Sequence, residues 1–200
     1  MTDPNDALSH LLLPALPLRD VCLFPEASLA ILVTDPAAIK AVEMAERSRL
    51  PLLALAEKDG GGPPPGLHTV GTLAAMVKNE RGPGGRRVEL DGLRRAQALS
   101  FVLGPPVIAE AVLLADGDPG DDWGGAVEAL ARYLHAHPEL RAFLDGQRRS
   151  KEPMSWVNLA CQHLPIAATA RQRLLEADAR ERCLKISRGL DALLRKEQSA

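Results

Sequence analysis

The sequence predicts an α+β protein in which a mostly antiparallel barrel or sandwich with one helix precedes an all-helical part. Short apolar runs with β-branched members dominate residues 16–115, as expected for strands. Apolar residues recur at helical spacing over residues 126–197. An acidic stretch rich in Gly and Pro, residues 116–125, separates the two parts as a linker. Residues 1–15 are expected to be a flexible lead-in.

The composition limits the classes of function. The 200 residues are 46% hydrophobic but only 3% aromatic, so the core must consist of aliphatic side chains. The net charge of -2 argues against wholesale electrostatic binding of nucleic acid. The three cysteines form no CxxC pair, which favours free thiols in a reducing compartment. Without a signal sequence or an apolar run of about 20 residues, we expect a soluble cytoplasmic protein.

The first element predicted is a buried strand between Leu16 and Pro25. Proline donates no ladder hydrogen bond, so Pro17 and Pro25 are expected at strand margins or on an edge. The charged pair Arg19-Asp20 interrupts the apolar pattern, which predicts a bulge or a paired surface step there.

A second strand, Ser28–Val33, leads into the helix of the first part. Asp35 is a good N-cap residue, and Pro36 suits the first helical position. The helix should end near Ser48, because Pro51 disfavours helical geometry in the residue before it.

The remaining strands follow at short intervals up to residue 114. Gly71 is expected at a bulge or a close approach, and Gly92 is expected to end a strand. The glycines between Asn79 and Gly85 predict a hairpin turn. The expected strands are Leu52–Ala56, Leu67–Val77, Arg86–Asp91, one or two within Leu93–Leu103, and Val107–Leu114.

Several segments resemble, in one order, the amino-terminal substrate-binding domain of Lon proteases. They are PLRDVCLFP at 17–25, LHTVGT at 67–72, DGLRRA at 91–96, and the helical segments 156–164, 171–176 and 181–182. The sequence departs from the family pattern at Glu26-Ala27 and at Glu57. The resemblance implies a PUA-like β-barrel followed by a C-terminal α-helical bundle. It also implies recognition of unfolded or hydrophobic polypeptide segments, or of a protein partner.

The catalytic parts of that family are not found in this sequence. No GxxxxGK[ST] phosphate loop occurs, since no lysine follows a glycine, and no GxSxG motif occurs. We therefore expect a stand-alone, non-enzymatic relative that lacks the ATPase and protease domains, with no catalytic residues and no cofactor.

Candidate metal ligands fail on spacing. His135 and His137 lie two residues apart on a helix and point to different faces, and the same holds for Cys161 and His163. The acidic stretch 116–122 lacks the glycine and the bidentate glutamate of a calcium loop. No metal site is predicted.

The best candidate surface for a partner is the basic hairpin. Residues 78–95 hold six basic and three acidic side chains. A solvated hairpin face explains charges of mixed sign, whereas a functional interpretation is an electropositive surface for an acidic peptide or RNA. The candidate residues are Arg81, Arg86, Arg87, Arg94 and Arg95.

The leading hypothesis is a polypeptide-binding or adaptor protein that uses an apolar groove with polar rims between barrel and helices. An RNA- or nucleotide-binding module that uses the arginine hairpin is the alternative. An unrecognised hydrolase and a purely structural subunit remain as further hypotheses.

Overall fold

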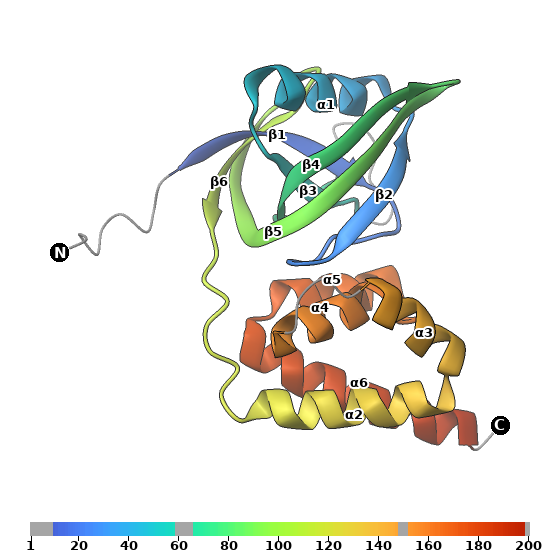
Figure 1. Ribbon diagram of the computed structural model, residues 1–200. Coiled ribbons are helices and arrows are strands. Elements are labelled where there is room, and N and C mark those ends of the chain that lie inside the picture. Colours follow the sequence, from blue (N-terminus) through green and yellow to red (C-terminus); the bar gives the residue numbers. More distant parts are fainter. Residues whose placement is uncertain (1–9, 59–65, 148–151, 199–200) are drawn as a thin grey trace. The chain divides into compact units, whose positions relative to one another are not determined.

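A computed structural model describes residues 10–58, 66–147 and 152–198 of the chain. The chain divides into two compact units, Met1–Leu114 and Ala115–Ala200, and each is described by itself. The first unit combines strands with one helix, and the second is helical (Figure 1). The predicted α+β fold class is confirmed.

The first unit is a six-stranded sheet that closes into a ring. The sheet order is β2-β5-β4-β3-β1-β6, and β5 also pairs with β6, which closes the ring. Among the strands of the described residues, only β1 and β3 pair in parallel, so the sheet is mostly antiparallel, as predicted. The strands are β1 (Leu11–Leu18), β2 (Ser28–Val33), β3 (Leu52–Ala56), β4 (Val70–Gly82), β5 (Gly85–Val102) and β6 (Ile108–Leu113).

Helix α1 (Pro36–Ser48) begins and ends as its sequence predicts. The Asp35 side chain accepts a hydrogen bond of 2.8 Å from the backbone N–H of Ala38. Arg49 adopts the left-handed conformation, with φ 53°, and its N–H bonds carbonyls of the last helical turn. This cap turns the chain sharply towards β3.

Two aliphatic clusters form the core of the first unit. Strand β3 is buried on both faces, and its alternating side chains divide between the clusters. Leu52 and Ala54 pack with the buried face of α1 in one cluster. Leu53 and Leu55 pack with residues of β1, β5 and β6 in the other.

The first strand differs from its prediction. β1 begins at Leu11, so residues 11–15 belong to the sheet and not to a lead-in; residues 1–9 lie outside the described residues. The strand ends at Leu18, and no bulge forms at Arg19-Asp20. Asp20 has φ 60°, a left-handed conformation that is incompatible with a continuing strand.

Gly92 does not end a strand but lies inside the continuous strand β5. A Cβ atom at this position would clash with the carbonyl oxygen of Phe24, so only glycine allows the two backbones to approach. The N–H of Gly92 bonds the carbonyl of Ala27, and its carbonyl accepts from the N–H of Glu26. Gly71 makes a similar close approach to Ala54, as expected.

The second unit starts its first helix earlier than predicted, within the expected linker. Asp122 lies in the first turn of α2, where a carboxylate interacts favourably with the helix dipole. At the start of the last helix, the side chain of Asp178 accepts from the N–H of Glu181, at 2.8 Å, as the capping pattern predicts. The helices are α2 (Asp122–Ala136), α3 (Pro138–Gln147), α4 (Pro153–His163), α5 (Ala168–Glu176) and α6 (Ala179–Gln198).

A fully buried arginine connects the segments of the second unit. The Arg182 guanidinium pairs with the Asp116 carboxylate at 2.9 Å and donates to the Asn158 side-chain oxygen at 2.6 Å. It also donates to the carbonyls of Leu174 and Ala177. One side chain of α6 therefore holds α4, the end of α5 and the segment that enters the unit.

Candidate functional site

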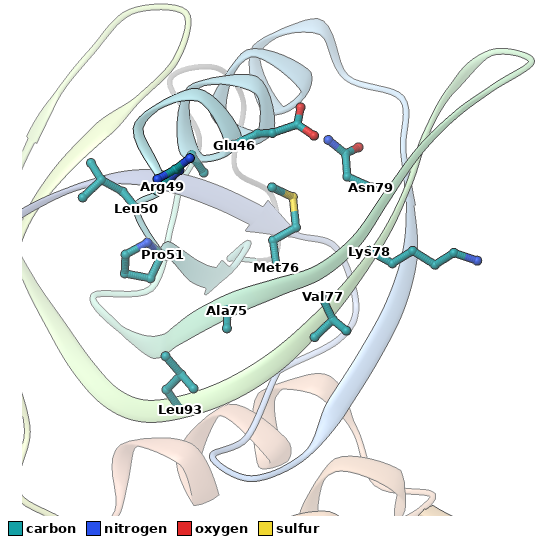
Figure 2. A pocket seen from close by; sticks show the side chains of 11 residues that line it. Glu46, Arg49, Leu50, Pro51, Ala75, Met76, Val77, Lys78, Asn79 and Leu93 are labelled. Carbon is teal, nitrogen blue, oxygen red and sulfur yellow. The ribbon is translucent and has the colours of Figure 1, made fainter.

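The first candidate site is a hollow of about 540 Å³ between α1 and β4, which we call the helix–strand hollow. Figure 2 shows the side chain of Met76 pointing towards α1, with Leu50 and Pro51 beyond the end of that helix. The side chains of Ala75 and Val77 leave β4 on the other side, so the lining includes both faces of this strand. The lining residues are Ala45, Glu46, Arg49, Leu50, Pro51, Ala75, Met76, Val77, Lys78, Asn79 and Leu93.

Two β-bulges supply exposed aliphatic side chains to this hollow. The pairing of β4 with β5 skips Val77, since Met76 pairs with Leu90 and Lys78 with Glu89. It also skips Leu93 in β5 at the second register shift. Val77 is 56% exposed and Leu93 45% exposed, as expected when bulges redirect side chains out of the regular alternation.

The rim of the hollow carries charges of both signs. Leu50, which is 43% exposed, follows the left-handed residue Arg49 and lies beside Pro51. Glu46 and Lys78 add one negative and one positive side chain. The hollow is therefore an apolar surface with a mixed polar rim, an arrangement typical of sites that bind apolar ligands.

The second candidate site is a hollow of about 610 Å³ lined by β1 and β2, which we call the strand gap. Its lining is mainly aliphatic, and its charged members are engaged. Arg19 donates to Glu57 at 3.2 Å, and Asp35 caps α1. The lining residues are Ala15, Pro17, Leu18, Arg19, Val21, Ile31, Leu32, Val33, Thr34, Asp35, Ala37, Ala38, Glu57 and Val107. Both hollows lie within the first unit, so the expected groove between barrel and helices stays a prediction.

The five predicted arginines do not form one exposed surface. Arg86 is 7% exposed and Arg95 is 4% exposed, so both belong to the interior. The Arg86 guanidinium bonds Glu43 of α1 at 2.7 Å and the side-chain oxygen of Asn79 at 3.1 Å. The hydrogen bond from Arg86 lowers the pKa of the Glu43 carboxyl. Arg86 thus fixes α1 against the β4–β5 hairpin beside the helix–strand hollow.

The other three arginines are exposed, but the hairpin also carries acidic partners. Arg81 lies 3.8 Å from Glu43, and Lys78 pairs with Glu80 at 2.9 Å. Arg87 is directly opposite Glu80 in the ladder, and Arg94 follows the bulge residue Leu93. A partner-binding role for Arg81, Arg87 and Arg94 stays a prediction.

His135 lies in α2 and His137 is the C-cap of that helix, whereas Cys161 and His163 lie in α4. The Nδ1 of His137 donates to the carbonyl of Tyr133, and the His137 ring stacks on the Tyr133 ring, while His135 is exposed on α2. Burial raises the pKa of the Cys161 thiol to about 12, and burial lowers the pKa of His163. Across residues 10–58, 66–147 and 152–198, no group of three or more His, Cys, Asp or Glu is placed to hold a metal ion.

The sequence did not predict that the residues of the two hollows line candidate sites. Val77 and Leu93 continue apolar strand patterns, and nothing in their neighbours marks a bulge. The usable signal was Leu50-Pro51, an apolar pair directly after a helix end. Within the part of the chain that the structure describes, no helix is both long and apolar enough to span a membrane.

Comparison with known proteins supports the relationship inferred from the motifs. Residues 12–191 match the family model described as the ATP-dependent protease La (LON) substrate-binding domain. A Lon protease of Phenylobacterium zucineum is 28% identical over 93% of this chain, and Lon protease 1 of Thermus thermophilus is 30% identical over 92%. The chain spans about a quarter of those relatives, 24% in each case.

Solved structures give the same fold. The N-terminal domain of a Mycobacterium avium complex Lon protease superposes with a TM-score of 0.72 at 20% identity, covering 90% of this chain and 98% of that chain. A Lon N-terminal domain protein from Xanthomonas campestris superposes with a TM-score of 0.64 at 19% identity, covering 88% and 95% of the two chains. Because the family model matches nearly the whole length of this chain, the chain belongs to the family of Lon substrate-binding domains.

Proposed function

We propose that this chain recognises exposed apolar stretches of other polypeptides and acts as a non-catalytic substrate-recognition or adaptor protein. The observation that carries the proposal is the helix–strand hollow, whose lining includes three exposed aliphatic side chains, Leu50, Val77 and Leu93, together with charged side chains. Family membership supports the same class of ligand, since the family is described as a substrate-binding domain.

The chemistry of the hollow favours an unfolded polypeptide over a folded one. Apolar side chains are mostly buried in folded proteins and become accessible when a chain unfolds. The hollow offers apolar area without a narrow polar constellation, so it selects for hydrophobicity and not for one sequence. The rim charges Glu46, Arg49 and Lys78 interact with polar groups that flank the bound segment.

Binding of a denatured model protein tests the proposal. Fluorescence anisotropy would be measured with dye-labelled, reduced and carboxymethylated α-lactalbumin, and with the native protein as comparison. Val77→Lys or Leu93→Lys should weaken binding about tenfold, because losing roughly 1.5 kcal/mol of apolar burial corresponds to that factor. Gel electrophoresis of the same mixtures should show the α-lactalbumin intact.

The chain offers a matched control. Leu99 is also skipped in a register shift of β5 and is 50% exposed, but it lies in neither hollow. Leu99→Lys should therefore bind the denatured protein as wild type does. Equal binding by all three lysine variants, or no preference for the denatured protein, would refute the proposal.

A further inference from the structure

Strand β2 is an edge strand whose outer side has no strand beside it among the described residues. It pairs only with the first half of β5, and the ring closes without it, through β5 and β6 (Figure 1). Its sequence, SLAILV, contains no charge and no proline, and its pairing with β5 has no bulge. Charged side chains, proline and bulges, which natural edges use against strand addition, are therefore absent from β2.

The opposite wall of the strand gap is a second incompletely paired edge. The first half of β1 pairs with β6, and its second half pairs with β3 on the other side. The N–H of Ala15 donates to the carbonyl of Val107 at 3.0 Å, and no strand among the described residues continues this side beyond it. Pro17 has no N–H and cannot donate a ladder hydrogen bond, so it protects the β1 edge against an added strand. The β2 edge has no such proline.

The hydrogen-bond alternation gives the direction of the peptide groups in β2. The carbonyl of Ala27 accepts a hydrogen bond from the N–H of Gly92 in β5. Because alternate residues of an antiparallel strand direct their N–H and C=O groups to the same side, the backbone groups of Leu29, Ile31 and Val33 also point towards β5. The peptide groups of Ala30 and Leu32 therefore point away from β5. Side chains follow the complementary pattern, since Leu29, Ile31 and Val33 pack in the core and Leu32 is 60% exposed.

We propose that β2 binds an extended, uncharged and aliphatic segment of a client polypeptide as an added strand in the strand gap. The N–H and C=O groups of Leu32, which lines the gap, and of Ala30, which precedes the lining residues in β2, form the ladder with the client. Alternate client side chains enter the hollow beside Val21, Ile31 and Val107. This inference deepens the proposed function, on which it rests, by adding a backbone-mediated mode of recognition.

The charge of the strand gap selects this occupant. Arg19 and Glu57 neutralise each other, and the Asp35 carboxylate is engaged at the N-terminus of α1. The aliphatic lining is complementary to aliphatic side chains, and an unpaired ionised side chain from the client would lose hydration there without gaining a partner. A charged segment is therefore disfavoured, and an aliphatic strand fits.

A peptide pair tests the backbone contribution directly. The probe is a dye-labelled octapeptide of alternating valine and serine, compared with the same peptide carrying N-methyl groups on alternate residues. N-methylation of the hydrogen-bonding edge should weaken binding at least about tenfold, the loss expected when several ladder bonds of about 1 kcal/mol each are removed. Amide hydrogen exchange should slow at Ala30 and Leu32 when the unmodified octapeptide binds.

Two protein variants test the same edge. Leu32→Lys introduces a charge at the exposed position, and Ala30→Pro removes an N–H that points away from β5. Both should weaken octapeptide binding about tenfold, whereas Leu99→Lys should not. Circular dichroism melts verify that each variant is folded, and Leu32→Lys keeps the test decisive if Ala30→Pro unfolds.

The outcomes separate this inference from the proposed function. If denatured α-lactalbumin binds but the octapeptide tolerates N-methylation and both β2 variants, strand addition is refuted and the proposed function stands. If neither ligand binds wild type, the proposed function fails and the inference fails with it. A dimer in light scattering that Leu32→Lys dissociates would overturn the inference, because a second copy of the chain would then occupy the edge.

Discussion

At the residue scale, Arg182 shows how one buried charge stabilises the helical unit. Its guanidinium is fully buried and bonds the side chains of Asp116 and Asn158 and two backbone carbonyls. Each of those acceptors would lose a strong partner if the guanidinium were removed. Removing one member of such a network is more costly than the net value of the pair.

Arg182→Ala should lower the free energy of unfolding by about 3–5 kcal/mol, because several buried acceptors lose their donor together. Urea denaturation followed by circular dichroism measures this change. Arg182→Lys should recover only part of it, because one ammonium group cannot reproduce the planar fork of donors. Arg188→Ala, at an exposed position of α6, is the matched control and should change stability by less than about 0.5 kcal/mol. Equal effects at the two positions would contradict the network.

The buried thiol of Cys161 predicts a pH dependence of stability. Burial raises its pKa from about 9 to about 12 in the folded protein. Between these values the unfolded chain releases the proton and the folded protein keeps it, so stability is full below pH 9 and falls as pH rises. The slope contributed is at most about 1.4 kcal/mol per pH unit. Urea titrations from pH 8 to 11 should show a steeper decline for wild type than for Cys161→Ala; parallel declines would argue against a buried neutral thiol.

At the scale of elements, strand β5 connects most parts of the first unit. It pairs with β2, β4 and β6, and it remains continuous through Gly92 because that residue lets Phe24 approach. Its register shifts place Leu93 and Leu99 on the surface. A single strand thus joins the ring, the edge strand and part of the helix–strand hollow.

Gly92→Ala should destabilise the protein by about 1–3 kcal/mol, because the added methyl group forces the Phe24 carbonyl away. Gly82→Ala, at a position where an added Cβ meets nothing within 4 Å, should be close to neutral. Thermal melts of the two variants measure the difference. A Gly82→Ala variant as unstable as Gly92→Ala would show that the close approach is not the cause.

The elements also show what the sequence could predict. Helix α1 was predicted correctly from Asp35, Pro36 and Pro51, because local chemistry decides both of its ends. The boundary of β1 was wrong, because its pairing with β6 and the left-handed Asp20 depend on distant contacts. The bulge residues Val77 and Leu93 were not foreseen, because register shifts are decided by the partner strand and not by local pattern.

At the scale of the whole molecule, charge distinguishes a polypeptide ligand from a nucleic acid. The net charge is -2, and two of the five arginines proposed for a partner are buried. We expect the affinity for denatured α-lactalbumin to change less than about twofold between 50 and 300 mM salt, because apolar contacts are little screened. Binding of single-stranded RNA would instead fall steeply with salt. Anisotropy titrations at several salt concentrations measure both, and a steep loss for α-lactalbumin would contradict the apolar mechanism.

The pairing of β1 with both β6 and β3 affects the order in which the ring folds. The side chains of His10 and Glu110, 100 residues apart in the chain, form a hydrogen bond of 2.6 Å beside the β1–β6 ladder. Contacts of such long sequence separation raise the contact order and slow folding. During synthesis, the ring cannot close until β6 has left the ribosome, so the nascent barrel exposes the apolar edge of β1 for most of its translation.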